Sequence, residues 1–301
     1  MKVKECLRHQ TEALFAAMAV ATNTADIPEE AKVAEAQEVC RLLLAFVLLC
    51  APKELVFHKE EELTPEQEVQ FCNLCERAKA GYPVQYLIGE QEFMSLPFTV
   101  GEGVLIPRWE TELLVEKALE LLPKEQPVVI ADICTGSGAI GVSLCHYLPD
   151  CYCFAVDISE AALVYAQANS VKNKVADRME FFQGDLLCPL QVRQKNNPAF
   201  ALDMILSNPP YVTEKEMREL PLNVQYEPKL ALFGGEDGLV FYLRLAAEAP
   251  ALLKQGGWLC VECGHLQGEA IKQLWEKKGF VHVEILKDYA GKDRMVIGQK
   301  K

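Results

Sequence analysis

Apolar residues recur at helical spacing through the first 80 residues of the chain. The positions that open this pattern are Val3, Cys6, Leu7, Leu14 and Met18. A second helix is predicted to begin near Asp26 and Pro28, because an acid or amide can cap a first turn that contains proline. A third helix is predicted to begin at Thr64. These patterns predict a helical domain over residues 1–81.

The pattern changes between residues 82 and 107. Two runs, at 82–89 and 92–100, are rich in aromatic and β-branched residues and are interrupted by glycine and proline. Such runs predict strands joined by a turn. We therefore expect residues 82–107 to form a hairpin linker.

From residue 108 to 301 apolar runs alternate with amphipathic stretches. The runs predicted as strands are 128–132, 153–157, 179–183, 202–206, 258–262, 281–286 and 295–298. The stretches predicted as helices are 110–121, 139–148, 159–169, 238–253 and 267–278. This alternation predicts an α/β domain with a doubly wound, mostly parallel, seven-stranded sheet. The last two strands have no helix between them, so we expect them to pair antiparallel.

The charge of the chain argues against a grip on nucleic-acid phosphates. Its 30 Lys and Arg are outnumbered by 43 Asp and Glu, for a net charge of −13, and no part shows a basic footprint. The longest apolar segment, 42–51, is half the roughly 20 residues of a membrane span. With twelve cysteines and no signal-peptide core, a cytoplasmic protein with reduced thiols is expected.

Two Cys-x-x-Cys pairs raise the question of a metal site. They are Cys72 with Cys75, and Cys260 with Cys263. Zinc sites built from two such pairs keep them about 15–20 residues apart, whereas these lie far apart along the chain. We expect buried structural cysteines and no bound metal.

A glycine-rich loop, residues 134–138, lies between the first predicted strand and its helix. Gly136 and Gly138 allow close approach of a ligand to the backbone at a helix N-terminus. With Gly141 they also fit the G-x-G-x-x-G pattern of dinucleotide-binding proteins. Asp157, at the end of the second strand, can accept hydrogen bonds from both ribose hydroxyls. These features fit a nicotinamide cofactor and S-adenosylmethionine equally well.

Two further groups favour methyl transfer. Asp185 follows the third strand, where a carboxylate can accept a hydrogen bond from an adenine amine. The fourth strand ends in the quartet Asn208-Pro209-Pro210-Tyr211, whose two prolines force the chain out of the sheet along an extended path. The Asn208 amide and the proline carbonyls can accept from a planar NH₂ group, and Tyr211 can stack on its face. This set suits methylation of a conjugated nitrogen.

Nearly the whole chain resembles the HemK-like (PrmC) methyltransferases, which modify the glutamine of the GGQ loop in peptide-chain release factors. The matching blocks are residues 83–89, 93–98, 104–112, 134–138, 155–159, 184–185, 207–211, 227–228, 231–232, 234–239, 256–257, 262–264 and 288–294. The quartet alone is shared with adenine N6-methyltransferases, and the flanking blocks are more specific. The resemblance implies a class I S-adenosylmethionine-dependent fold, a release factor as protein substrate, and a monomer that needs no nucleic acid.

The resemblance also implies roles for individual residues. S-adenosylmethionine would be bound by Cys134, Thr135, Gly136, Ser137, Gly138, Asp157, Asp185, Leu186 and Asn208. The glutamine would be bound by Asn208, Pro209, Pro210 and Tyr211, with Asn208, Pro209 and Tyr211 catalytic. The helical domain would help to dock the release factor.

The chain departs from the family pattern at a few positions. Cys134 stands where the family has the first glycine of the loop, so we expect a backbone conformation there that does not require glycine. Trp109 replaces a proline, Ser95 a glycine, and Leu186 an aromatic residue found in some members.

Three alternatives remain at this stage. A nucleic-acid adenine methyltransferase could use the same quartet, but it would need a basic surface. A non-catalytic S-adenosylmethionine-binding protein would not need an intact quartet. An oxidoreductase would share the glycine loop and Asp157 but would have no use for the quartet.

Overall fold

The computed structural model describes residues 1–20 and 28–301 and contains two compact units. The first comprises Met1–Gly89 and Glu219–Tyr226, and the second comprises Glu90–Arg218 and Glu227–Lys301. The chain thus passes between the units three times.

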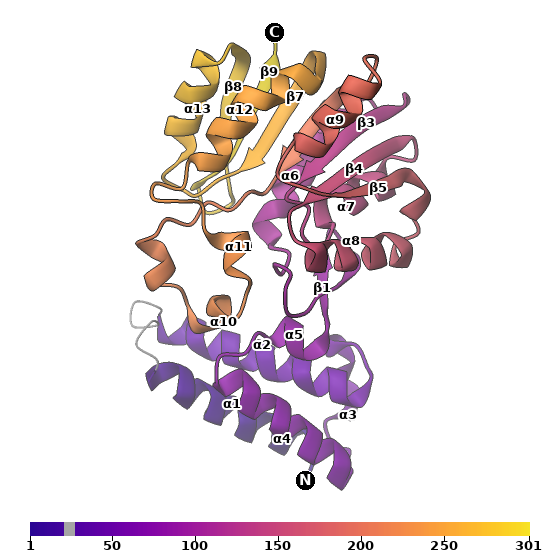
Figure 1. Ribbon diagram of the computed structural model, residues 1–301. Coiled ribbons are helices and arrows are strands. Elements are labelled where there is room, and N and C mark those ends of the chain that lie inside the picture. The colour runs from indigo at the N-terminus through magenta and orange to yellow at the C-terminus, as the bar shows by residue number, and fades with distance from the viewer. Residues whose placement is uncertain (21–27) are drawn as a thin grey trace. The chain divides into compact units, whose positions relative to one another are not determined.

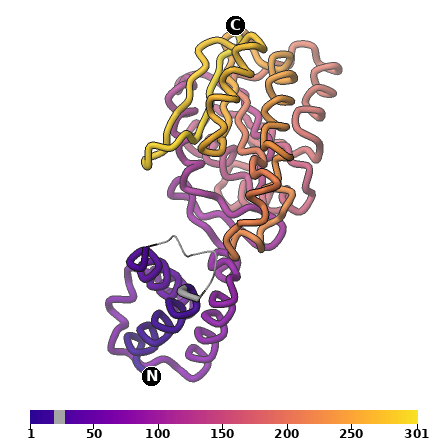
Figure 2. The backbone as a smooth tube through the Cα atoms, turned by 90° about the vertical axis from the view of Figure 1, so that its left-hand side faces the viewer, coloured from indigo at the N-terminus to yellow at the C-terminus, as the bar shows by residue number. Residues whose placement is uncertain are grey.

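Three long helices, α1 (Val3–Val20), α2 (Glu29–Leu48) and α4 (Pro65–Lys79), pack side by side in the first unit (Figures 1 and 2). The predicted start at Thr64 is confirmed by a capping box, in which Thr64 Oγ1 accepts from Gln67 N at 3.2 Å and Gln67 Oε1 accepts from Thr64 N at 3.0 Å. The predicted cap at Asp26 lies outside the described residues. The short helices α3 (Leu55–His58), α5 (Val84–Ile88) and α10 (Leu222–Gln225) also belong to this unit.

The expected strand at residues 82–89 is wrong. Val84–Ile88 forms the short helix α5, which follows Pro83 and ends at Gly89 with a φ of 81°. Leu87 and its neighbours pack into the core of the first unit, so burial outweighs their β-propensity. The hairpin itself consists of β1 (Glu90–Phe93) and β2 (Leu96–Thr99), and it belongs to the second unit.

The second unit is built on a seven-stranded sheet with the order β5-β4-β3-β6-β7-β9-β8. Its strands are β3 (Val128–Ile133), β4 (Cys151–Asp157), β5 (Met179–Gln183), β6 (Leu202–Ser207), β7 (Leu253–Glu262), β8 (Phe280–Lys287) and β9 (Asp293–Lys300). The first five are parallel, and β9 pairs antiparallel with both β7 and β8. The predicted sheet and its antiparallel end are confirmed.

Helices cover both faces of this sheet. Its helices are α6 (Trp109–Leu121), α7 (Ala139–Tyr147), α8 (Glu160–Lys172), α9 (Cys188–Asn196), α11 (Lys229–Leu232), α12 (Val240–Leu252) and α13 (Gly268–Lys277). In β3, Ile130 packs with α6 and α7, whereas Ala131 packs on the opposite face with α12 and α13. On that second face α9, α12 and α13 lie side by side (Figure 1).

Helix α9 was not predicted, because only Leu190 of its nine residues is buried and no apolar stripe is present. The strand order reverses between β3 and β6, both of which pair with neighbours on either side. In open α/β sheets, ligands bind at the carboxyl ends of the strands beside such a reversal. Among the described residues, no helix has the length and apolar character of a membrane span.

Candidate active site

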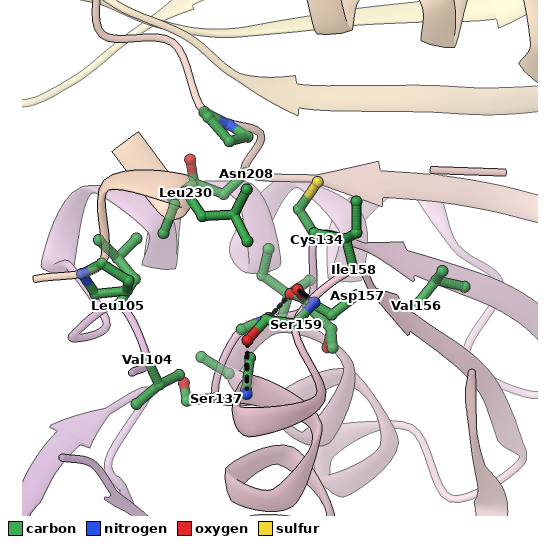
Figure 3. Close-up of a pocket in the computed structure, with 18 of the residues that line it drawn as sticks. Val104, Leu105, Cys134, Ser137, Val156, Asp157, Ile158, Ser159, Asn208 and Leu230 are labelled. Atoms are coloured by element: carbon green, nitrogen blue, oxygen red, sulfur yellow. Dashed lines mark hydrogen bonds between the residues drawn. The ribbon is translucent and has the colours of Figure 1, made fainter. Parts of the chain in front are cut away.

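A cavity lies at the carboxyl ends of β3, β4, β5 and β6, with about 1030 Å³ of space not filled by atoms and partly open to solvent. Figure 3 shows Cys134, Asp157, Ile158 and Ser159 grouped in one part of its wall and Asn208 with Leu230 in another. Of the predicted cofactor- and substrate-binding residues, those that line it are Cys134, Thr135, Gly136, Ser137, Asp157, Asp185, Leu186, Asn208 and Pro210.

Asp157 holds two loops of the cavity through backbone groups. Its Oδ2 accepts from Gly136 N at 2.8 Å, and its Oδ1 accepts from Ser159 N at 2.9 Å. Figure 3 shows Asp157 and Ser159 close together in the cavity wall. Burial raises the pKa of this carboxyl group, and the backbone donors oppose that rise. Each carboxylate oxygen keeps a further lone pair, so Asp157 can still accept from a ribose diol.

Asp132 is fully buried beneath the glycine loop and was not predicted as a site residue. Its Oδ2 accepts from Thr135 Oγ1 at 2.6 Å and from Gly141 N at 3.0 Å. Its Oδ1 is buried without a partner among the described residues. Burial, opposed by these two donors, raises the pKa of Asp132 to about 7.

Two non-glycine residues of the cavity wall have left-handed backbones. The φ angle is 59° at Cys134 and 48° at Leu186. The backbone at Cys134 thus lies in a region that favours glycine but does not require it, because a residue with a Cβ can adopt it at some cost. Such a conformation costs a residue with a Cβ about 1 kcal/mol, and here the surrounding loop contacts impose it.

Asp185 is engaged by a residue that sequence reasoning missed. Arg244, on α12, donates to both of its oxygens, from Nη1 to Oδ1 at 2.9 Å and from Nη2 to Oδ2 at 2.8 Å. The bidentate pair fixes the plane of the carboxylate at the rim of the cavity and leaves lone pairs for another donor. No local motif signals Arg244, because it follows Asp185 by 59 positions.

Asn208 is tied to two buried residues from other elements. Its Nδ2 donates to Thr111 Oγ1 at 3.1 Å, and Thr111 Oγ1 donates to Glu262 Oε2 at 2.5 Å. Tyr211 donates to the other oxygen of the same carboxylate, Glu262 Oε1, at 3.3 Å. Burial raises the pKa of both Glu262 and Tyr211. Thr111 and Glu262 lie in blocks that carry the family resemblance, but the sequence assigns them no role.

Three predicted site residues do not line the cavity: Gly138, Pro209 and Tyr211. Gly138 has a φ of 83°, and a Cβ there would lie 3.2 Å from the Cα of Ala166. The glycine therefore allows α7 to begin close against α8. The Tyr211 ring packs against the sheet core on the side of α12.

Arg108 and Glu227 form an ion pair beside the cavity. Glu227 is buried and also accepts from Ile106 N at 3.0 Å. This pair connects the segment before α6 to the segment that leads into α11, whose Leu230 and Ala231 line the cavity. Next to Arg108, the exposed Trp109 stacks on Tyr289, with ring centroids 6.4 Å apart.

The four cysteines of the two Cys-x-x-Cys pairs are buried or partly buried in the protein. Cys75 in α4, Cys260 in β7 and Cys263 are buried, and Cys72 is partly buried. All twelve cysteines lie in the described part of the chain and are free thiols.

The parallel sheet with its antiparallel end and the cavity at the strand reversal make a Rossmann-like fold, and the family models assign this fold to the class I methyltransferases. A family model described as "PrmC N-terminal domain" matches residues 24–89, and one described as "Methyltransferase small domain" matches residues 110–223. A solved methyltransferase structure from Pyrococcus furiosus shares the fold, with a TM-score of 0.50 at 21% identity, over 69% of this chain and 90% of that chain.

Relatives with higher sequence identity show to which family of methyltransferases the chain belongs. A release factor glutamine methyltransferase from Moorella thermoacetica is 44% identical over 261 residues, which are 86% of this chain and 90% of the relative. Another from Aquifex aeolicus is 36% identical over 259 residues, 86% of this chain and 89% of the relative. The chain belongs to the release factor glutamine methyltransferase family.

Proposed function

We propose that this chain transfers a methyl group from S-adenosylmethionine to the side-chain amide nitrogen of the glutamine in the GGQ loop of a class 1 peptide-chain release factor. The observation that carries the proposal is the state of the Asn208 amide. Its nitrogen is occupied by Thr111, and among the described residues nothing donates to its Oδ1. The oxygen of a cavity-lining amide is therefore available to a substrate N–H.

The residues of the cavity fit S-adenosylmethionine. Asp157 offers spare lone pairs to the ribose hydroxyls, Asp185 offers an oriented carboxylate to the adenine amine, and Leu186 contributes an apolar wall. Thr135, Gly136 and Ser137 would bind the methionine part together with Cys134. We assign Gly138 an indirect role: without a Cβ, it allows α7 to begin close against α8.

An amide nitrogen is a poor nucleophile because its lone pair is delocalised into the carbonyl group. Asn208 Oδ1 and the Pro209 carbonyl would each accept one proton of the glutamine NH₂, and no described residue donates to either oxygen. Asn208 lines the cavity and Pro209 does not, so Asn208 Oδ1 is the acceptor that the geometry supports more directly. Two acceptors hold the nitrogen in one orientation and favour its pyramidalisation. Pro210, which lines the cavity, would frame the amide plane, and Tyr211, which packs in the sheet core, would support it indirectly through its bond to Glu262.

When bound, S-adenosylmethionine supplies an electrophilic methyl group on a sulfonium and leaves as the thioether S-adenosylhomocysteine. Transfer would break the carbon–sulfur bond and form the nitrogen–carbon bond, and the amide nitrogen would give up its proton to water. The step therefore requires no side chain to act as a base.

We further propose that the helical unit docks the release factor, and that the enzyme acts as a cytoplasmic monomer without nucleic acid. The net charge of −13 supports the part of this proposal that excludes nucleic acid, and the twelve free thiols support a reducing compartment. An adenine N6-methyltransferase would use the same Asn208 acceptor, so substrate choice has to be measured.

The test is methyl transfer from labelled S-adenosylmethionine to a mixture of release factor, unrelated protein, tRNA and DNA. We expect label only in the release factor, and none when the glutamine of its GGQ loop is replaced by alanine. Asn208→Ala should lower turnover about a thousandfold while it leaves cofactor binding, measured by calorimetry, within a few-fold.

Asn196→Ala is the matched control, because Asn196 is exposed at the end of α9, and it should behave as the wild type. Label in tRNA or DNA would contradict the assigned substrate. Near-normal turnover of Asn208→Ala would contradict the assigned acceptor.

A further inference from the structure

Three elements that are distant in sequence bring polar groups together behind the quartet. Thr111 lies in the first turn of α6, Glu262 ends β7, and Asn208 follows β6. Only 4% of the Thr111 surface and 2% of the Glu262 surface are exposed. A buried carboxylate and a buried hydroxyl are costly unless they are hydrogen-bonded, so their arrangement beside the cavity calls for an explanation.

The direction of each hydrogen bond follows from the chemistry of the groups. Burial raises the pKa of Glu262, but three neighbours favour its ionised form, namely the donors Thr111 and Tyr211 and the positive charge of Arg294. An ionised carboxylate can only accept, so the Thr111 hydroxyl donates its proton to Glu262. The hydroxyl then has only lone pairs to offer to Asn208, and these require an N–H donor. The Asn208 amide is thereby locked with Nδ2 toward Thr111, and a flip of 180° would set two acceptors against each other.

We propose that Glu262 and Thr111 are positioning residues for Asn208: they fix its amide so that Oδ1, and not the NH₂ group, is presented to the substrate. The proposal rests on the proposed function, because the orientation matters only if Oδ1 accepts a substrate proton. A flipped amide would offer a donor to the substrate NH₂ and would hold its nitrogen out of place.

The same carboxylate also anchors the other end of the quartet. Tyr211 donates to Glu262 Oε1, and the Tyr242 hydroxyl donates to the Glu262 backbone carbonyl at 3.0 Å. Glu262 therefore accepts a hydrogen bond from Thr111, which binds Asn208 at the start of the quartet, and another from Tyr211, at the end of the quartet. A single buried group can hold the quartet in register with α6.

The first test is kinetic and compares Thr111→Val, which removes the hydroxyl at constant volume, with Thr111→Ser, which keeps it. We expect Thr111→Val to lower kcat roughly ten- to a hundredfold, as small misplacements of reacting groups do. KM for the release factor and Kd for the cofactor should change less than threefold. Thr111→Ser should recover kcat to within a few-fold of the wild type.

A double-mutant cycle shows whether Thr111 acts through Asn208. In the Asn208→Ala background, Thr111→Val should lower kcat no further, because the group it orients is gone. If the two losses multiply, or if Thr111→Ser is as impaired as Thr111→Val, the proposed positioning role is wrong.

A second readout is independent of methyl transfer. The two Nδ2 proton signals of Asn208 in ¹⁵N-labelled protein are identified by their loss in Asn208→Ala. In the wild type and Thr111→Ser we expect them to be dispersed and slow to exchange with solvent. In Thr111→Val they should shift toward free-amide positions and exchange at least tenfold faster; unchanged signals would overturn the proposal.

This measurement separates the two proposals. If the wild type labels no release factor, the proposed function fails, yet the amide signals still decide whether Thr111 orients Asn208. Should Thr111→Val fold poorly because Glu262 loses a donor, the pair Thr111→Val with Glu262→Gln removes the buried charge as well. That pair should show the same signal shift and the same loss of kcat.

Discussion

The two halves of the cavity are held in place by different means. In the glycine-loop half, formed by the ends of β3 and β4, Asp157 binds the backbone N–H groups of Gly136 and Ser159. In the quartet half, Asn208 is bound by the side chain of Thr111, which is bound by that of Glu262.

The two halves also differ in how far apart their hydrogen-bond partners lie along the chain. Asp157 is 21 positions from Gly136, whereas Thr111 is 97 positions from Asn208 and 151 from Glu262. Backbone N–H groups are present whatever the side chain, so the two bonds of Asp157 do not depend on which side chains stand at residues 136 and 159. The second half depends on the identity of each side chain. We therefore expect a substitution in one half of the cavity to leave the other half functional.

The largest effect that should separate them is that of Asp157→Asn. An amide NH₂ would face the N–H of Gly136 or Ser159, so the loop should lose a hydrogen bond and the ribose an acceptor. We expect cofactor affinity to fall roughly a hundredfold, or about 3 kcal/mol, and kcat at saturating cofactor to fall less than tenfold.

Calorimetry and steady-state kinetics measure these two quantities. Asp203→Asn is the control, because Asp203 also accepts from a backbone N–H, Val129 at 2.8 Å, and stands at the start of β6, away from the cavity. A kcat loss as large as the affinity loss would show that the halves are coupled.

The buried Asp132 should make the stability of the glycine-loop half depend on pH. Its folded pKa, about 7, is above the ordinary value of 3.8, so the folded state holds a proton that the unfolded state has released. Stability is then highest at low pH and falls as pH rises from about 4 to 7, by of order 1 kcal/mol per pH unit.

Urea unfolding between pH 5 and 8 checks this against Asp132→Asn, which has no such group to ionise. The wild type should lose stability relative to the variant as the pH rises through this range. A difference that is constant with pH would mean that Asp132 is ionised throughout.

A smaller effect is expected for Arg244→Met, which frees the Asp185 carboxylate to rotate. Because both partners are partly exposed, the ion pair itself contributes little to stability, but cofactor affinity should fall about three- to tenfold. Arg193→Met is the matched control, since Arg193 makes a comparable pair with Glu180 outside the cavity wall. Tighter cofactor binding by Arg244→Met would mean that Arg244 competes with the ligand for Asp185.

The smallest effect should come from the backbone of Cys134. With a φ of 59°, a Cβ is unfavourable there, so Cys134→Gly should be more stable than Cys134→Ala by about 1 kcal/mol. Thermal unfolding of the two variants measures the difference. A more stable alanine variant would mean that the loop relaxes when the thiol is removed.

Most of the sheet could be predicted from the sequence because its central strands β3, β4 and β6 are largely buried on both faces and are therefore continuous apolar runs. The alternation was sufficient to predict seven strands and the antiparallel end, and β5 begins and ends at the predicted residues. Helices α9 and α5 could not be predicted in this way. The first is mostly polar, and the second is built from residues that favour strands but pack in a helical core.

The residues of the candidate site also divide into those that the sequence predicted and those that it did not. Gly136, Asp157, Asp185 and Asn208 were predicted because each lies at or just after the carboxyl end of a strand, at the same edge of the sheet, whereas Cys134 was predicted from the family resemblance. Arg244 could not be predicted, because its position on α12 has no pattern that refers to Asp185.

The sequence by itself determined the order of strands and helices, the glycine loop and the Asn208-Pro209-Pro210-Tyr211 quartet, because hydrophobic periodicity and proline geometry act locally. Only the tertiary structure decided which way the Asn208 amide faces. That orientation depends on Thr111 and Glu262, which meet because α6 packs beside β7. Hydrogen bonds between side chains that are distant in the sequence produce no periodic pattern in it. The series of bonds from Glu262 through Thr111 to Asn208 can therefore be recognised only in the folded chain.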